Sequence, residues 1–460
     1  MPMTDTICAP ATAPGGALGI IRVSGPAAFD AVSTLCQLSC HQVAANTVHY
    51  TRLTAPVPAG FPAGQEVIDE ALVTVFHAPH SYTGEDSVEI SCHGSSYIFN
   101  RVLELLLQNG CRMANPGEFT MRAYLNGKLD LSQAEAVADL IASSNRVTHQ
   151  MAMSQLRGHF SSELSRLRDQ LLRLTSLLEL ELDFSDHEDL EFADRTELLH
   201  LASTIDTRVL QLAKSFETGQ ALKQGIPVAI VGKTNVGKST LLNRLVKDER
   251  ALVSDIHGTT RDTIEETMEI QGVTFRFIDT AGIRQTADTV EQMGIERTYQ
   301  MIEKARIILW VIDEQPTEAE VREMAERSKG RTLLPIINKA DTLCSPSVQY
   351  AAQLPQRPLL ISAKTGQGLD ALEQAIFTSA DLPALSDSGV IVANARHYDA
   401  LCRAHASIRR VLDGLGVGLS GDLLSEDLRQ ALDILAEITG GQITPQETLN
   451  NIFSHFCVGK

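Results

Sequence analysis

The sequence predicts a multidomain fold: an N-terminal α+β domain, then an all-α helical domain with an α/β domain inserted into it. Three observations support this prediction. A chain of 460 residues corresponds to about three domains. Short apolar runs separated by Gly and Pro are replaced by helical spacing near residue 122. Alternating strand and helix patterns then occupy residues 219–381, and helical spacing returns after them. The expected domains are therefore 1–122, 123–218 with 382–460, and 219–381.

The first domain is indicated by runs such as ALGIIRVSG, EALVTVFHAP and SVEISCHG, with one helix-like stretch, YIFNRVLELLLQNG. This mixture is typical of an α+β domain. The helical domain begins with LSQAEAVADLIASS and continues with leucines at three- and four-residue spacing, which predict a long amphipathic helix: Leu164, Leu167, Leu171, Leu174, Leu178 and Leu182.

After the linker DLPALSDSG, the same helical spacing returns in ALCRAHASIRRVLDGL and DLLSEDLRQALDILAEITG. We expect one helical domain, assembled from both segments, with the α/β domain inserted between them. Within the insertion, the runs IPVAIVG, VTFRFID, RIILWVID, RTLLPIIN and RPLLISA alternate with helical stretches. This alternation predicts a mostly parallel, doubly wound sheet.

Composition narrows the function classes. The chain has 39 basic and 57 acidic residues, a net charge of −18, which argues against a broad phosphate-binding surface. Any RNA contact is expected to be local or shared with a partner. The start lacks the features of a signal or transit peptide, and no apolar run reaches the ~18 residues of a membrane span. We expect a cytoplasmic protein without membrane association. The eight cysteines form no CxxC pair, which favours reduced thiols.

The inserted domain carries GKTNVGKS, GTTRD, DTAG, NKAD and SAK in this order. A strand, a glycine-rich loop and a helix present backbone N–H groups to phosphates. Lys238 is expected to reach the β- and γ-phosphates, and Ser239 and Thr260 to bind Mg²⁺. Asp341 is expected to accept two hydrogen bonds from guanine, which selects GTP over ATP.

The predicted GTP-binding residues lie in these five motifs and their immediate neighbours. They are Asn235, Val236, Gly237, Lys238, Ser239, Thr240, Ser254, Asp255, Ile256, His257, Gly258, Thr259, Thr260, Asp279, Thr280, Ala281, Gly282, Asn338, Lys339, Asp341, Ser362, Ala363 and Lys364.

One catalytic group of Ras-like enzymes is missing. They place a water-orienting Gln just after DTAG, where this chain has Ile283. We hypothesise that a K⁺ ion supplies positive charge instead, held by Asn235 and oxygens of Ser254, Ile256 and Thr259. The alternative is that Asn235 only braces the loop.

Outside the inserted domain, the chain contains GIIRVSG, APHSYTGEDSVEISCHG, PGEFTMRAYLNGKLDLSQAEAVADLI and a terminal CVGK. With these motifs it resembles the MnmE (TrmE) family of tRNA modification GTPases over essentially all 460 residues. The resemblance implies an N-terminal α+β folate-binding domain that forms a homodimer, then a helical domain interrupted by a Ras-like G domain. It also supports the K⁺ site.

The resemblance implies further site residues. Glu291 would orient the catalytic water through a bridging water, although its own pattern indicates only a solvated charge. The implied folate-binding residues are Arg22, Glu89, Lys128 and Lys460. From their own patterns, Arg22 and Lys128 would be surface charges, and Glu89 would lie on the exposed face of a strand. Arg and Lys suit the anionic glutamate tail of a folate, and a carboxylate suits pterin N–H donors.

The implied function is a K⁺-stimulated, Mg²⁺-dependent GTPase that modifies the wobble uridine of certain tRNAs at C5. Its expected partner is MnmG, which brings FAD, and its one-carbon donor is a formyl or methylene tetrahydrofolate. The carboxymethylaminomethyl and aminomethyl products stay open. Two alternatives also remain: a GTPase switch in ribosome or RNA assembly, and a folate enzyme regulated by GTP.

Cys457 lies in the terminal CVGK. It could be a nucleophile, a redox group or a packed tail residue. Because FSHF precedes it and no basic surroundings that would lower its pKa are evident, we favour packing. The phenylalanines are expected to anchor the tail.

Overall fold

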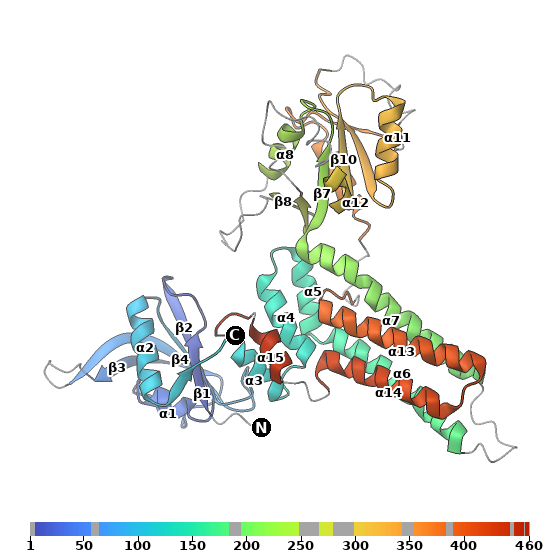
Figure 1. The fold of residues 1–460 in the computed structure, drawn as a ribbon. Helices are drawn as coiled ribbons and strands as arrows, with labels where there is room; N and C mark the ends of the chain where they lie inside the picture. Colours follow the sequence, from blue (N-terminus) through green and yellow to red (C-terminus); the bar gives the residue numbers. More distant parts are fainter. Residues whose placement is uncertain are drawn as a thin grey trace. The chain divides into compact units, whose positions relative to one another are not determined.

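The computed structural model describes residues 5–56, 64–183, 195–247, 266–278, 299–342, 354, 356–382, 390–441, 446–454 and 456–459. The chain forms two compact units (Figure 1). The first contains Met1–Ala142, Ala152–Val209 and Asp399–Lys460, and the second contains Ser143–Met151 and Leu210–Tyr398. The second unit is thus inserted in the first, as the helical patterns on both sides of it predict.

The N-terminal part of the first unit is a sheet in the order β3-β4-β5-β2-β1-β6. Its elements are β1 (Thr6–Pro10), β2 (Leu18–Ser24), α1 (Ala28–Ser33), β3 (Thr47–Pro56), β4 (Gln65–Phe76), β5 (Ser87–His93), α2 (Ser96–Gln108) and β6 (Cys111–Met113). Helices α1 and α2 pack on one face (Figure 1). Because side chains alternate along a strand, Ile21 and Val23 enter this core while Arg22 lies on the opposite face. The α+β prediction is confirmed.

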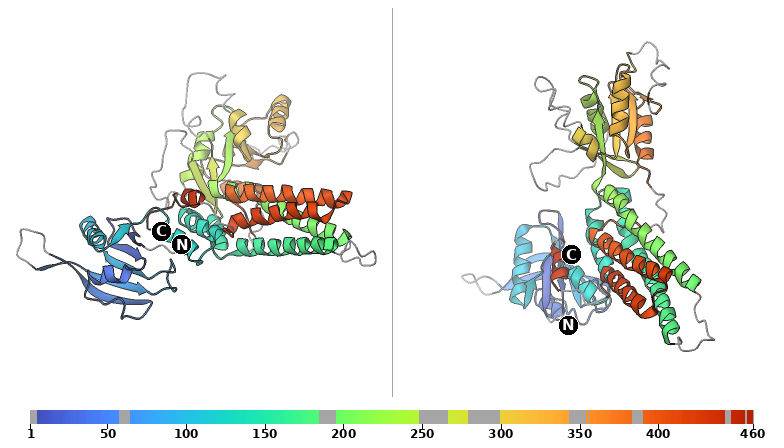
Figure 2. Two further views of the ribbon diagram at one scale, coloured as in Figure 1. Left: turned by 60° about the horizontal axis from the view of Figure 1, so that its bottom comes forward. Right: turned by 45° about the vertical axis from the view of Figure 1, so that its right-hand side comes forward.

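The helical part of the first unit contains α3 (Glu118–Leu125), α4 (Leu131–Ala142), α6 (His159–Asp183), α14 (Gly421–Thr439) and α15 (Gln446–Ser454). Figures 1 and 2 show α6 and α14 side by side, although they are distant in the sequence. The predicted leucines from Leu164 to Leu178 all lie in α6 and are buried. One helical domain built from both flanking segments is therefore confirmed.

Three helices cross the division between the units: α5 (Arg146–Leu156), α7 (Arg195–Gln224) and α13 (Ala395–Val417). The expected domain boundaries at residues 122 and 218 fall inside α3 and α7. Both boundaries stay predictions. The helical periodicity runs across them without a break, so composition alone could not place them more closely.

The second unit holds a sheet in the order β12-β11-β10-β7-β9-β8. Its elements are β7 (Ile226–Val231), α8 (Lys238–Lys247), β8 (Glu266–Ile270), β9 (Val273–Phe277), β10 (Ile307–Ile312), α11 (Glu318–Arg327), β11 (Thr332–Ile337), β12 (Leu359–Leu360) and α12 (Leu369–Ser379). All neighbouring strands are parallel except the β8–β9 hairpin. The mostly parallel sheet is confirmed.

Strands β10 and β7 form the centre of this second sheet, and both are almost entirely buried. Their carboxyl ends meet at one edge, where ligands bind in open α/β sheets. Among the described helices, none is both long and apolar enough to cross a bilayer.

Candidate functional site

The glycine-rich loop joins β7 to α8, and two of its positions require glycine. Gly232 has φ +151°, and a Cβ there would lie 2.2 Å from the carbonyl oxygen of Val311. Gly237 has φ +98°, and a Cβ there would lie 2.3 Å from Nδ2 of Asn338. The loop can therefore follow its path against β10 and the base-recognition loop only without side chains at these positions.

Lys238 begins α8, and its ammonium turns back over the loop. Its Nζ donates to the carbonyl oxygens of Gly232 at 2.6 Å and Lys233 at 2.5 Å. Burial lowers the pKa of Lys238. A cation, a helix N-terminus and left-handed backbone at Asn235 (φ +63°) and Gly237 together suit the phosphates of a nucleotide. The donor set thus fits the predicted ligand.

Asn338 joins this loop to the SAK segment from a position after β11. Its Nδ2 donates to the carbonyl oxygen of Val236 at 2.8 Å, and its Oδ1 accepts from the N–H of Ala363 at 3.0 Å. Asn338, Val236 and Ala363 are at most 3% exposed. One amide side chain therefore holds three sequence motifs in register.

Asp341 lies at the mouth of the same site. Its Oδ1 accepts a hydrogen bond from Oγ of Ser362 at 2.7 Å, and this bond lowers the pKa of Asp341. Ser362 is fully buried and fixes the carboxylate. Lys339, with φ +62°, donates from Nζ to Asp313 Oδ2 at 2.6 Å. The arrangement holds one carboxylate in a fixed orientation, as the predicted contact of Asp341 with guanine requires.

Sequence reasoning missed the acidic partners around this loop. Lys233 pairs with Glu314 at 3.0 Å and with Glu320 at 2.9 Å, and Asp313 supports Lys339. Asp313 and Glu314 directly follow β10. The sequence did contain a signal for them: acidic residues that directly follow a buried strand lie at the carboxyl edge of the sheet, where ligands bind.

Many predicted nucleotide and ion residues lie outside the described residues. These are Ser254, Asp255, Ile256, His257, Gly258, Thr259, Thr260, Asp279, Thr280, Ala281, Gly282 and the proposed catalytic Glu291. They stay predictions. The described part of the site comprises the P-loop, including Ser239 and Thr240 at the start of α8, and the two base-recognition segments ending at Lys364.

A second site lies on the face of the N-terminal sheet that α1 and α2 leave open. Arg22 on β2 is directly opposite Glu89 on β5, and Nε donates to Glu89 Oε1 at 2.9 Å. A second guanidinium nitrogen of Arg22 donates to the carbonyl oxygen of Gly459 at 3.2 Å. The guanidinium also lies over the rings of Tyr82 and Phe119, at 5.4 and 5.6 Å. These two expected folate residues therefore form one partly buried ion pair.

Lys128 approaches the same region from the α3–α4 turn. Its Nζ donates to the carbonyl oxygen of Pro79 at 3.0 Å, and its stem packs near Gly84. The segment from Pro79 to Gly84 also contributes Tyr82 to the Arg22 cluster. Lys460 is outside the described residues, but its neighbour Gly459 contacts Arg22. This set of groups suits a folate. The guanidinium and ammonium suit its anionic glutamate tail, the carboxylate suits pterin N–H donors, and an aromatic ring can stack on the pterin.

Arg122 is the buried charge that sequence reasoning missed. It is 1% exposed and donates to Asp5, Glu85 and Glu118. Glu118, also 1% exposed, accepts from the Asn115 N–H at 2.8 Å and pairs with a second arginine. Burial raises the pKa of Glu118, but these hydrogen bonds outweigh burial and lower it overall. The i,i+4 spacing of Glu118 and Arg122 was the only local signal.

The C-terminal tail docks within the first unit, as its phenylalanines predict. Phe453 and Phe456 are buried in a cluster with Leu131. The backbone carbonyl of Cys457 accepts from the N–H of Gly117 at 3.3 Å. The Cys457 side chain itself is exposed, so our packing interpretation of this thiol was wrong. The phenylalanines and the backbone hold the tail, which leaves the thiol facing solvent.

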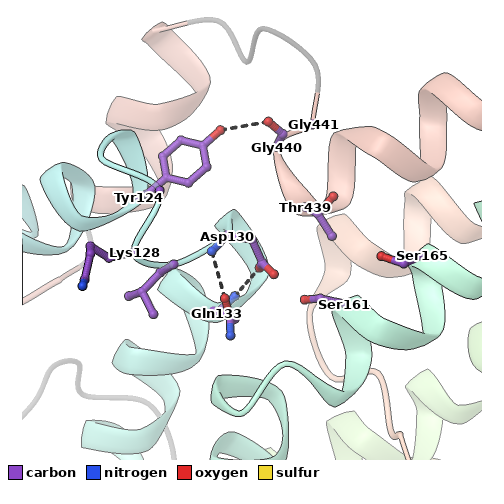
Figure 3. Close-up of a pocket in the computed structure, with 11 residues that line it drawn as sticks. Tyr124, Lys128, Asp130, Gln133, Ser161, Ser165, Thr439, Gly440 and Gly441 are labelled. Carbon is purple, nitrogen blue, oxygen red and sulfur yellow. Dashed lines mark hydrogen bonds between the residues drawn. The ribbon is translucent and has the colours of Figure 1, made fainter. Parts of the chain in front are cut away.

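A cavity of ≈ 500 Å³ opens beside Lys128 (Figure 3). Its walls come from the α3–α4 turn, the beginning of α6 and the end of α14. Tyr124 closes one side by donating from its hydroxyl to the Gly440 carbonyl oxygen at 3.2 Å. Asp130 and Gln133 line the opposite wall with a pair of mutual hydrogen bonds.

Comparisons with known proteins show the family to which this chain belongs. The family description "GTP-binding protein TrmE N-terminus" matches residues 6–128, and "MnmE helical domain" matches residues 131–457. The tRNA modification GTPase MnmE of Phocaeicola vulgatus is 51% identical over 99% of both chains. The proteins of the same name from Bacteroides thetaiotaomicron and Porphyromonas gingivalis are each 50% identical, over 99% of this chain and 99% and 98% of theirs. The chain belongs to the MnmE family of tRNA modification GTPases.

Proposed function

We propose that this tRNA modification GTPase depends on Mg²⁺, is stimulated by K⁺, and acts with MnmG on the wobble uridine of certain tRNAs. The one-carbon unit added at C5 comes from a formyl or methylene tetrahydrofolate. One observation carries the proposal: the chain is 51% identical, over 99% of its length, to a tRNA modification GTPase. The hydrogen bonds that Asn338 and Asp341 make between the nucleotide-binding motifs support it.

The roles proposed at the GTP site follow from the described contacts. Lys238 and the loop N–H groups hold the phosphates, and Ser239 contributes a hydroxyl to Mg²⁺. Asp341 accepts from guanine, while Asn338 keeps the two loops in register. Adenine would leave this ionised carboxylate without donors, which is costly in a partly dry site.

The proposed K⁺ site is centred on Asn235. This residue is exposed on the P-loop with a left-handed backbone, which supports a role as an ion ligand. A K⁺ ion held there would supply positive charge to the reaction, and Glu291 would orient the attacking water. The test is GTP hydrolysis in K⁺ and Na⁺ buffers. Equal rates would contradict the ion site, and a wild-type rate in Glu291→Ala would remove Glu291 from the mechanism.

The proposed folate site uses Arg22, Glu89, Lys128 and Lys460. The Arg22–Glu89 pair and the Lys128 ammonium border one segment, Pro79 to Gly84, which supports a single site. Titration with 5-formyltetrahydrofolate tests this. Glu89→Gln and Lys128→Met should weaken binding about 10-fold or more, as expected when a charged hydrogen-bonding group is lost. Binding as tight as that of the unaltered protein would contradict these assignments.

We propose a homodimer across the open face of the N-terminal sheet. Val48, Tyr50 and Leu72 are exposed there, and Tyr50 and Leu72 are paired across β3 and β4. An exposed apolar group on a sheet face is typical of an interaction surface. Sedimentation of Tyr50→Asp, with the exposed Tyr97→Asp on α2 as control, tests this. A dimer as stable as the wild type would contradict the proposed surface.

The overall test is mass spectrometry of tRNA nucleosides from cells that lack this gene, complemented with the intact chain or with Asp341→Asn. Unmodified wobble uridines that only the intact chain restores support the proposal. Unchanged wobble uridines would favour the alternative of a ribosome or RNA assembly switch. Copurification with MnmG tests the partner separately.

A further inference from the structure

One short segment, Pro79–Gly84, is held in place beside the proposed folate residues. It lies between β4 and β5, and the α3–α4 turn fixes it at two points. The Lys128 ammonium donates to the carbonyl oxygen of its first residue at 3.0 Å, and Nδ2 of Asn126 donates to the carbonyl oxygen of Thr83 at 2.8 Å. Between these two points the segment carries Tyr82. The turn that supplies Lys128 therefore also sets the backbone position of this tyrosine.

The Tyr82 ring is itself held at two places. Its hydroxyl shares a hydrogen bond of 2.8 Å with Oγ1 of Thr120, which is fully buried in α3. The Arg22 guanidinium lies over the ring, 5.4 Å from its centre, and Nε of the same guanidinium donates to Glu89. A hydrogen bond at one end and a cation against the face give the ring a fixed orientation next to the Arg22–Glu89 pair.

Exposure distinguishes Tyr82 from the other ring beside Arg22. Phe119 also lies near the guanidinium, at 5.6 Å, but it is fully buried, so no ligand can reach it. Tyr82 is 38% exposed although its hydroxyl is anchored. An exposed and oriented aromatic ring beside convergent polar groups is typical of the wall of a small-molecule site. Of these two rings, Tyr82 alone can touch a bound molecule.

We propose that Tyr82 is a further folate-binding residue whose ring stacks on the conjugated rings of the folate, with Thr120 as the residue that positions it. This inference rests on the proposed function. The charged residues of the site recognise the glutamate tail and the pterin N–H groups, but they leave the flat faces of the ligand uncovered. A neutral ring beside the ion pair covers such a face and excludes water from it.

The first test compares dissociation constants of 5-formyltetrahydrofolate for two changes at one position. Tyr82→Leu keeps apolar bulk but removes the ring, and it should weaken binding about 10-fold or more, as expected when a ring that stacks on a heterocyclic base is lost. Tyr82→Phe keeps the ring and loses only the hydrogen bond to Thr120, so it should weaken binding about 2- to 5-fold. A clearly smaller loss in Tyr82→Phe than in Tyr82→Leu identifies stacking.

Thr120→Val tests the positioning role, because valine keeps the shape of threonine without its hydroxyl. It should weaken binding about 2- to 5-fold, as Tyr82→Phe does. Since both changes break the same hydrogen bond, the double variant Tyr82→Phe/Thr120→Val should bind the folate about as well as either single variant. A threonine with only a structural role would leave the affinity unchanged or add its own loss to that of Tyr82→Phe.

Two comparisons make the test specific. Tyr97→Leu removes an exposed tyrosine of α2, which packs on the other face of the sheet, and it should bind the folate like the unaltered chain. The second comparison uses 5-formyltetrahydropteroate, which lacks the glutamate tail. Tyr82→Leu should weaken its binding by the same factor as that of the complete folate, because the conjugated rings are common to both ligands.

The outcomes separate this inference from the folate site on which it rests. Unaltered affinity in Tyr82→Leu, or equal losses in Tyr82→Leu and Tyr82→Phe, would overturn it, as would an effect that disappears with 5-formyltetrahydropteroate. If thermal unfolding shows that Tyr82→Leu does not fold, unaltered affinity in both Tyr82→Phe and Thr120→Val would overturn it. Failure of the unaltered chain to bind 5-formyltetrahydrofolate would instead refute the proposed folate site, and the role of Tyr82 with it.

Discussion

Replacing Asn338 with alanine tests whether one side chain joins the P-loop to the base-recognition segment. The substitution removes the donor to Val236 O and the acceptor for the Ala363 N–H, at 2.8 and 3.0 Å. Both remaining backbone groups belong to residues that are at most 3% exposed, so water does not readily replace the lost partner.

The cost can be estimated from these two groups. A buried polar group left without a partner costs about 1–3 kcal/mol, so the loss of both partners in Asn338→Ala should destabilise the second unit by about 2–6 kcal/mol. For a domain of this size, this corresponds to a fall in Tm of roughly 4–24 °C. GTP affinity should fall as well, because the phosphate and base loops are no longer held in register.

Thermal unfolding with and without GTP provides the assay, with Thr342→Ala as the matched control. Thr342 also hydrogen-bonds a backbone carbonyl in this loop, that of Lys339, but its side chain is exposed. The control should change Tm by no more than about 2 °C, in keeping with surface substitutions. If Asn338→Ala unfolded at the same temperature as the control and bound GTP normally, the bridging role would be refuted.

Three further predictions follow from the geometry. Asp341→Asn should weaken GTP binding about 10- to 100-fold and improve xanthosine triphosphate binding, because the amide donates to xanthine O2; competition assays measure both. Glu118→Gln should cost about 1–3 kcal/mol at neutral pH in denaturant unfolding. Since the Glu118 pKa is lowered in the fold, its contribution is present above 4.5 and is lost at lower pH, so the variant should approach the wild type in acid. Gly459→Ala should weaken 5-formyltetrahydrofolate binding, because its Cβ would lie 2.1 Å from Pro10 O, whereas Gly110→Ala, with similar φ and open space, should not.

The GTP site was predictable because each of its parts is a short contiguous motif. Strand β7, the loop and α8 follow one another directly, so the spacing from Gly232 to Lys238 already indicates the loop that we propose binds the phosphates. The other segments end at the same edge because β10, β11 and β7 are parallel. Local pattern and sheet topology therefore specify the same site.

The proposed folate site on the N-terminal sheet was not predictable from residue patterns. Its groups come together only because the strands pair in one register and the C-terminal tail docks beside them. Arg22 and Glu89 are 67 residues apart and face each other only because β2 pairs with β5. Gly459 reaches Arg22 from the other end of the chain. Resemblance to the family supplied Arg22 and Glu89, whereas it indicated neither Gly459 nor the buried Arg122 network.

The insertion also explains why the domain boundaries were hard to place in the sequence. A flexible linker would show Gly, Ser or Pro at the junction and would let the inserted unit move without effect on its host. Here α5, α7 and α13 each continue through the division, so the amphipathic pattern persists past it. Because each of the three junctions lies within a helix, hydrophobic periodicity alone cannot show where one unit ends and the next begins.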